Sequence, residues 1–165
     1  MAEPALKPDS PAVPAGTRQA FSHYEGDLYT WVQEQVALLR AGRTDALDLD
    51  HIAEELSDVG SELYFRLQSA IEIVFLHMLK WEHQPERRSR SWVLSIAEHR
   101  ARIDILLRKN PGLKSRVAEA VEDGFRLGRL RAAREMKRSL STLPAACPYS
   151  WDDILNRPFD LDIDR

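Results

Sequence analysis

The amino-acid sequence predicts an all-α fold, an antiparallel up-and-down bundle of about four helices. Apolar residues recur at steps of three and four along most of the chain, which is the period of a helix. Proline and glycine separate these runs by short intervals, as in bundles whose neighbouring helices are antiparallel. The 165 residues, 44% hydrophobic and 30% charged, are enough for one compact domain.

The first residues differ in composition from the rest of the chain. Four of the nine prolines are Pro4, Pro8, Pro11 and Pro14, in a segment almost free of large apolar side chains. Such a segment buries too little surface to offset the entropy lost on ordering. We therefore predict a flexible tail over residues 1–20 and a single helical domain over residues 21–165.

The first two helices are predicted from long apolar rows. One helix runs from Tyr24 to Ala41, and Gly42 follows it as a left-handed cap. The next begins at Asp48 or Asp50 and stops before Pro85, for about 32 residues or about 48 Å. Its row follows steps of three and four through Ile52, Leu56, Val59, Leu63, Leu67, Ala70, Val74, Met78 and Trp81.

The third and fourth helices follow short connections. Pro85 suits the first turn of a helix, with Ser89 or Ser91 as a later N-cap in the alternative, and Asn110-Pro-Gly112 ends it. The fourth helix runs from Leu113 to about Lys137.

An irregular aromatic C-terminal tail completes the predicted fold. It contains one short helix capped by Ser150. Its large apolar residues predict a segment that folds back onto the bundle or onto a partner; they are Tyr149, Trp151, Ile154, Leu155 and Phe159.

Charge is segregated along the chain. Residues 1–85 hold 6 Lys and Arg against 14 Asp and Glu, residues 86–138 hold 15 against 7, and residues 139–165 hold 2 against 5. We expect basic helices to pack beside acidic ones, so the pattern does not indicate nucleic-acid binding.

Composition also bears on location. No apolar run reaches about 18 residues and the N-terminus has no signal-peptide pattern, so we expect neither a membrane span nor secretion. The single cysteine, Cys147, suits a reducing compartment, and we expect a cytoplasmic protein.

The end of the second predicted helix carries the unusual string His77-x-Leu-Lys-Trp81-x-x-Gln84-Pro85. With this string the chain resembles a bacterial family, domain of unknown function 29, and the resemblance covers nearly everything after the tail. Further matching positions are Tyr24-Glu-x-Asp27, Trp31, Leu38-Leu-Arg-x-Gly42, Leu47-Asp48, Glu54-Glu55, Gly60, Ser91-Trp92, Arg100, Asn110-Pro-x-Leu113, Leu143-Pro144, Cys147-Pro148 and Phe159. The chain departs from the family's pattern at His51, His99, Gly112 and residues 135–139. The resemblance implies an all-helical fold and no particular reaction.

The stretch from residue 77 to residue 92 is the best candidate for a site. Four side chains share one face at a helix end at spacings i, i+3, i+4 and i+7, and two more follow the turn; the six are His77, Lys80, Trp81, Gln84, Arg88 and Trp92. Such a set can hold an anionic or planar ligand, with arginine binding the anion and tryptophan stacking on it. The alternative is a polar network that closes the bundle end.

A second candidate is a metal-carboxylate site on the second helix. Imidazole and carboxylates at helical spacing can share a metal ion, and the candidate ligands are His51, Glu54, Glu55 and Asp58. The order His-x-x-Glu is the reverse of the Glu-x-x-His of helical di-iron bundles, which favours a solvated face without metal.

These features predict a helical bundle that acts through association with itself or with another protein, without a cofactor and without catalysis. The alternatives are a small-molecule or anion-binding protein or enzyme with its site at residues 77–92, and the metal site. The apolar row from residue 52 to residue 81 favours association, because it is longer than the following helix can cover.

Overall fold

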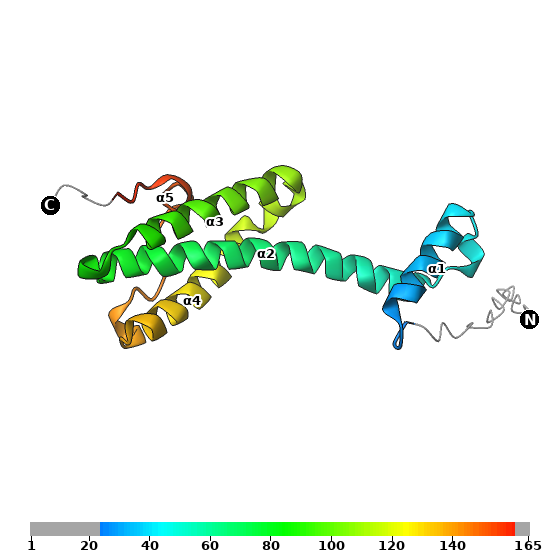
Figure 1. Cartoon of the computed structure of the whole chain (residues 1–165), viewed down its shortest axis with the longest axis horizontal. Coiled ribbons are helices and arrows are strands. Elements are labelled where there is room, and N and C mark those ends of the chain that lie inside the picture. The colour runs from blue at the N-terminus through cyan, green and yellow to red at the C-terminus, as the bar shows by residue number, and fades with distance from the viewer. Residues whose placement is uncertain (1–23, 161–165) are drawn as a thin grey trace, which may run out of the picture. The chain divides into compact units, whose positions relative to one another are not determined.

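The structure, a computed structural model, describes residues 24–160. Within this range the chain is helical and contains no strand, which confirms the predicted all-α fold (Figure 1). The segments are α1 (Leu28–Arg40), η1 (Thr44–Ala46), α2 (Leu49–His83), η2 (Pro85–Arg87), α3 (Arg90–Lys109), η3 (Pro111–Arg116), α4 (Val117–Met136), η4 (Leu140–Thr142) and α5 (Trp151–Asn156). None of the helices between residues 24 and 160 is both long enough and apolar enough to cross a lipid bilayer.

The chain divides into two compact units, residues 1–54 and 55–165. The α2 helix begins in the first unit and continues into the second. The single domain expected over residues 21–165 stays a prediction, and the predicted tail over residues 1–20 lies outside the described part of the chain.

In the first unit, α1 is bounded by two local caps. The carboxylate of Asp27 accepts a hydrogen bond from the Thr30 amide at 3.0 Å, so the helix begins after Asp27 rather than at Tyr24. At its other end Gly42 has φ +68°, and the Arg43 amide donates to the Leu38 carbonyl at 3.0 Å. The predicted left-handed glycine cap is thus confirmed.

In the second unit, α2, α3 and α4 form the core. The Tyr64 hydroxyl meets Asp123 near the start of α4, and Lys80 meets Glu135 near its end, so α2 and α4 run in the same direction. The connection through η2 reverses the chain, and α3 runs antiparallel to both, as Figure 1 shows. Fully buried side chains of α2 and α3 belong to one hydrophobic core with residues of α4; those of α2 and α3 include Leu67, Ile71, Val74, Phe75, Leu79, Ile96 and Ile103.

The α4 helix approaches α2 closely because two of its contact positions are glycine. A Cβ built on Gly128 would lie 2.8 Å from the carbonyl oxygen of Glu72, and one on Gly124 would lie 3.0 Å from the Ile71 side chain. A side chain at Gly128 would therefore force the two helices apart.

The starts of α3 and α4 correct the sequence analysis. A third helix beginning at Pro85 is wrong: Pro85–Arg87 form a single 3-10 turn, and α3 starts at Arg90 after an extended Ser89. The later start, with Ser89 as N-cap residue, is confirmed in its backbone, although the Ser89 hydroxyl bonds to Ser91 at 2.8 Å rather than capping an amide. The 3-10 helix η3 likewise delays α4 to Val117.

The C-terminal segment folds back onto the bundle, as predicted. Ile154 and Phe159 belong to the buried core. The Arg100 guanidinium donates to the carbonyls of Asp153, Ile154 and Arg157 at 2.9, 2.7 and 2.8 Å. One α3 side chain thus binds three carbonyls at the end of α5, of which only that of Asp153 also accepts a backbone amide, that of Arg157.

Candidate functional site

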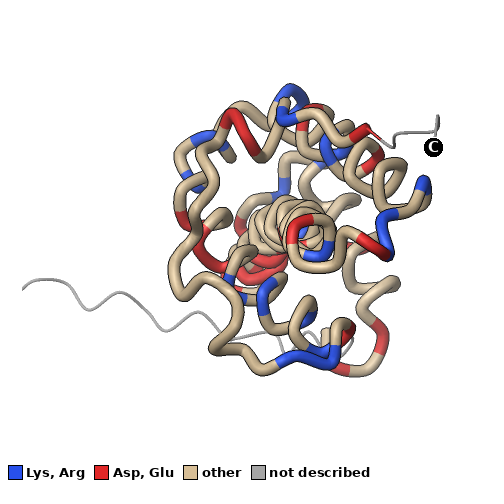
Figure 2. Tube along the Cα trace, turned by 90° about the vertical axis from the view of Figure 1, so that its left-hand side faces the viewer, with Lys and Arg blue, Asp and Glu red and all other residues tan. Residues whose placement is uncertain are grey.

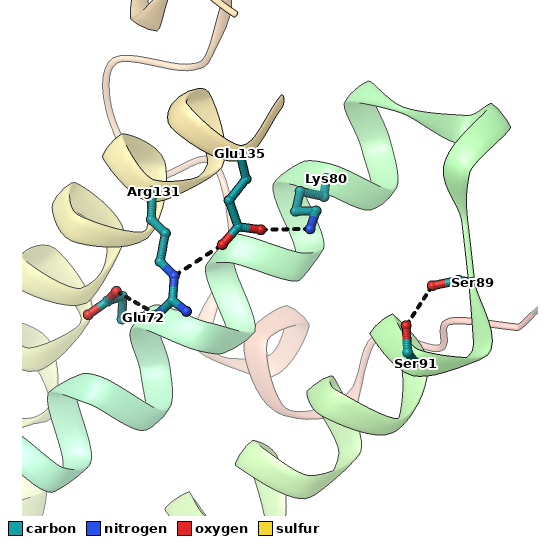
Figure 3. A network of polar contacts seen from close by, with 6 residues as sticks. All are labelled: Glu72, Lys80, Ser89, Ser91, Arg131 and Glu135. Carbon is teal, nitrogen blue, oxygen red and sulfur yellow. Dashed lines mark hydrogen bonds and ion pairs between the residues drawn. The ribbon is translucent and has the colours of Figure 1, made fainter. Parts of the chain in front are cut away.

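Lys80 lies in a chain of alternating charges between α2 and α4 (Figure 3). Its ammonium group is 2.8 Å from Glu135, whose other oxygen accepts from Arg131 at 3.2 Å, and Arg131 reaches Glu72 at 3.5 Å. The Lys80 ammonium also lies 4.5 Å from the centre of the Trp92 ring on α3. Its charge is therefore balanced inside the protein by a carboxylate and an indole face.

His77 is a half-buried neutral imidazole beside this chain of charges. Its ring centre is 6.2 Å from that of Trp92, and its buried Nδ1 atom has no hydrogen-bond partner. Burial, and then the positive charge of Lys80, lower the pKa of His77 to about 4. The ring is therefore uncharged at pH 7.

Arg88 and Trp81 form a separate pair. The Arg88 Nε atom donates to the Trp81 carbonyl at 3.0 Å, and the guanidinium lies 4.8 Å from the centre of the Trp81 ring. Trp81 itself is buried against Phe159, with ring centres 5.6 Å apart. Arg88 thus anchors the turn after α2 rather than joining Lys80.

The six residues predicted as one site therefore lie in two groups. His77, Lys80 and Trp92 meet on one side, and Trp81 pairs with Arg88. The Gln84 side chain is buried. Its backbone amide donates a hydrogen bond to the Lys80 carbonyl, which continues the hydrogen-bond pattern of α2. These contacts fit the polar-network alternative, and a ligand site at these residues stays a prediction.

In the first unit, His51 pairs with Asp48. The His51 Nδ1 atom lies 2.6 Å from the carboxylate, which also accepts from the Trp31 indole at 3.2 Å. The hydrogen bond to Asp48 raises the pKa of His51. Burial opposes ionisation of Asp48, but the bonds from His51 and Trp31 outweigh it and lower the pKa of Asp48. The sequence analysis treated Asp48 only as a helix cap and missed this pair.

The remaining metal candidates do not gather around His51. Glu54 and Asp58 are exposed and Glu55 is half-buried, and none of these three carboxylates has a hydrogen bond or ion pair within residues 24–160. In the described part of the chain, no group of three or more His, Cys, Asp or Glu side chains is placed to hold a metal ion. The metal site on α2 stays an untested alternative to the solvated face that the sequence favours.

The clearest unexplained surface in the second unit is a stretch of the apolar row of α2, which we call the α2 stripe: Leu56, Val59 and Leu63. Leu56 is 67% exposed and Val59 56% exposed, whereas Leu67 and Val74 on the same row are fully buried. Figure 1 shows α3 and α4 beside the C-terminal half of α2, and α2 extends beyond them toward its N-terminal end.

A second apolar surface lies on α4, beside Glu72 of α2. Leu127 and Leu130 are 37% and 49% exposed and help to line a hollow of about 370 Å³ with Glu72, Arg131 and Arg134. We call this the α4 surface. Figure 2 shows that basic and acidic positions alternate along the chain.

Two other hollows border α2. One of about 480 Å³ lies between α2 and α3, with exposed Phe65 and Ile105 in its apolar lining. The other, of about 560 Å³, contains the Tyr64 hydroxyl, which donates to Asp123 at 3.0 Å. Burial and that acidic partner raise the pKa of Tyr64 to about 12, so it remains a protonated donor at pH 7.

The fold and these surfaces define the class as an all-helical bundle protein. Two charged residues of its candidate polar site, Lys80 and Arg88, have partners within the protein. The chain belongs to the family described as Domain of unknown function DUF29, whose sequence profile matches residues 23–160. This match confirms the family resemblance. Comparisons with curated proteins and with solved structures gave no match.

Proposed function

We propose that the protein acts by association and that it binds a second copy of itself through the α2 stripe. The observation that carries this proposal is the change in exposure along one helical row. Leu56 and Val59 keep the spacing of the buried positions that follow, yet they are 67% and 56% exposed. An apolar row in core register that no helix of its own unit covers is typical of an interface.

The α2 stripe is large enough to drive weak association. Burial of a whole Leu or Val side chain stabilises by about 1.5–3 kcal/mol. Covering the exposed parts of Leu56 and Val59 is therefore worth about 2–4 kcal/mol before the entropy cost of association. A two-fold dimer contains the contact twice, which raises the gain to about 4–7 kcal/mol. This is close to the lowest cost of association, about 4 kcal/mol, so the stripe by itself supports only a weak, reversible dimer.

Association without catalysis also agrees with the contacts at residues 77–92. Lys80 and Arg88 already have partners in the protein, and His77 is neutral and half-buried. The proposal includes an oligomeric state and a cytoplasmic location. The single cysteine supports the cytoplasmic location.

Sedimentation equilibrium over a wide concentration range tests the proposal. The double variant Leu56→Gln and Val59→Gln removes the apolar surface. It preserves the helix, because Gln is a good helix former. The matched control is Leu94→Gln on α3, because Leu94 is 57% exposed and lies outside the stripe.

We expect a concentration-dependent dimer of the wild type and at least a tenfold higher dissociation constant for the double variant, since 1.4 kcal/mol corresponds to about tenfold. Leu94→Gln should dimerise like the wild type. A wild type that is monomeric at every accessible concentration would overturn the proposal. So would equal weakening by the control, because the effect would then not belong to the stripe.

A further inference from the structure

Acidic side chains flank the α2 stripe. Val59 has Glu55 four residues before it and Glu62 three residues after it, so both carboxylates neighbour Val59 on the helix surface. Glu55 has no ion-pair partner among residues 24–160, and Glu62 pairs only with Arg66 of its own helix. The stripe therefore presents an apolar centre between two acids separated by about 10.5 Å along the helix.

The α4 surface has the same layout with the opposite charge. Leu130 lies between Arg126, four residues before it, and Arg134, four residues after it. The Arg126 side chain pairs only with the partly exposed Asp123, and the Arg134 guanidinium makes no hydrogen bond or ion pair within residues 24–160. These two guanidinium-bearing positions are about 12 Å apart along α4, close to the spacing of the two acids.

We infer that the α2 stripe of one copy docks on the α4 surface of a second copy. Leu56 and Val59 then cover Leu127 and Leu130 and the hollow beside them, while Glu55 and Glu62 face Arg126 and Arg134. This inference rests on the proposed self-association and names the surface that the stripe contacts.

The pairing needs two copies. The α2 stripe and the α4 surface are both exposed within one unit, so they do not cover each other in a single chain. When each copy gives its stripe to the α4 surface of the other, the two identical contacts close a two-fold dimer. Pairing of stripe with stripe would instead bring Glu55 and Glu62 of both copies together, and like charges at an interface disfavour it.

Charge reversal tests the inference. The acidic-side variant carries Glu55→Lys and Glu62→Lys, and the basic-side variant carries Arg126→Glu and Arg134→Glu. The control, Arg108→Glu with Lys109→Glu, changes the net charge as much as the basic-side variant at exposed positions of α3. Circular dichroism and thermal midpoints check that each variant folds, and Gln in place of each charged residue gives a milder second set.

We expect each reversed variant alone to dimerise at least tenfold more weakly than the wild type, and the control to dimerise normally. An equimolar mixture of the acidic-side and basic-side variants should restore dimerisation, because both contacts then regain opposite charges. Raised salt should weaken the wild-type dimer.

The possible failures are distinguishable. If Leu56→Gln with Val59→Gln weakens the dimer while the basic-side variant does not, the docking surface is not α4 and the proposed self-association stands. Failure of the mixture to recover also overturns the α4 assignment. A monomeric wild type overturns both.

Discussion

Replacement of Gly128 by alanine tests how closely α4 packs on α2. The new Cβ would lie 2.8 Å from the Glu72 carbonyl oxygen and 3.0 Å from the Phe75 Cβ. The carbonyl belongs to the backbone of α2 and cannot rotate away. Ordinary contact begins near 3.4 Å, so the helices must separate by roughly 0.6 Å, which weakens packing along their shared surface.

Two opposing contributions set the size of the effect. Overpacking of this kind costs about 1–3 kcal/mol. Alanine in place of glycine inside a helix contributes about 0.8–1 kcal/mol of stability. We therefore expect Gly128→Ala to lower the free energy of unfolding by about 1 kcal/mol, with 2 kcal/mol as the upper end.

Gly60→Ala is the matched control, because a Cβ there meets no atom within 4 Å. It keeps the helix-propensity gain without the steric cost, so we expect it to raise stability by about 0.8–1 kcal/mol. Gly124→Ala should fall between the two, since its 3.0 Å contact is with the Ile71 side chain, which can move.

Urea denaturation followed by circular dichroism measures all three variants. The steric cost is the difference between Gly60→Ala and Gly128→Ala, about 1–3 kcal/mol, read from the midpoints at an unchanged denaturant slope. A Gly128→Ala protein as stable as Gly60→Ala would refute the close approach of the two helices.

Three further predictions concern single contacts. In the folded protein the pKa of His77 is about 4, against an ordinary 6.5, so the folded protein binds fewer protons than the unfolded chain between these two values. The free energy of unfolding should therefore fall as pH drops from 6.5 to 4, by about 1–2 kcal/mol once the partial exposure of His77 is taken into account. The urea midpoint of His77→Leu should depend less on pH in this window than that of the wild type. Arg100→Met removes three hydrogen bonds and leaves the carbonyls of Ile154 and Arg157 unpaired, while that of Asp153 keeps the Arg157 amide. The variant should expose residues 150–160 to faster amide exchange and proteolysis, at a cost of about 2–4 kcal/mol, and unchanged protection would contradict the anchoring role. Asp48→Asn should bring the pKa of His51, measured by NMR, down toward 6.5, and a pKa that stays raised would show that another group holds the proton.

Two kinds of local signal made most of the helices predictable. Apolar residues at steps of three and four indicate which face of a helix is apolar. Gly42, Pro85 and Ser150 mark helix ends, because each affects the turn of backbone next to it. The start of α3 was harder, because both Pro85 and Ser89 are acceptable helix starts. Here Pro85 begins only a 3-10 turn, and the backbone is extended at Ser89 before α3 begins.

The candidate site was predicted in composition but not in arrangement. His77, Lys80 and Trp92 do lie together, as helix spacing and the turn suggested. The partner of Lys80 is Glu135, which is 55 residues away, and one sequence gives no signal for a pair at that separation. The pairing of Arg88 with the Trp81 carbonyl depends likewise on the path of the turn.

The sequence by itself determined the all-α class, the family resemblance and the single apolar row of α2, because helical period and caps act between residues close in the chain. Tertiary structure decided which part of that row is core and which is surface. Leu67 is buried and Leu56 is exposed although both fit the same pattern, since burial depends on whether α3 and α4 reach that point of α2. The same dependence on distant segments separated Arg88 from Lys80 and joined Lys80 to Glu135.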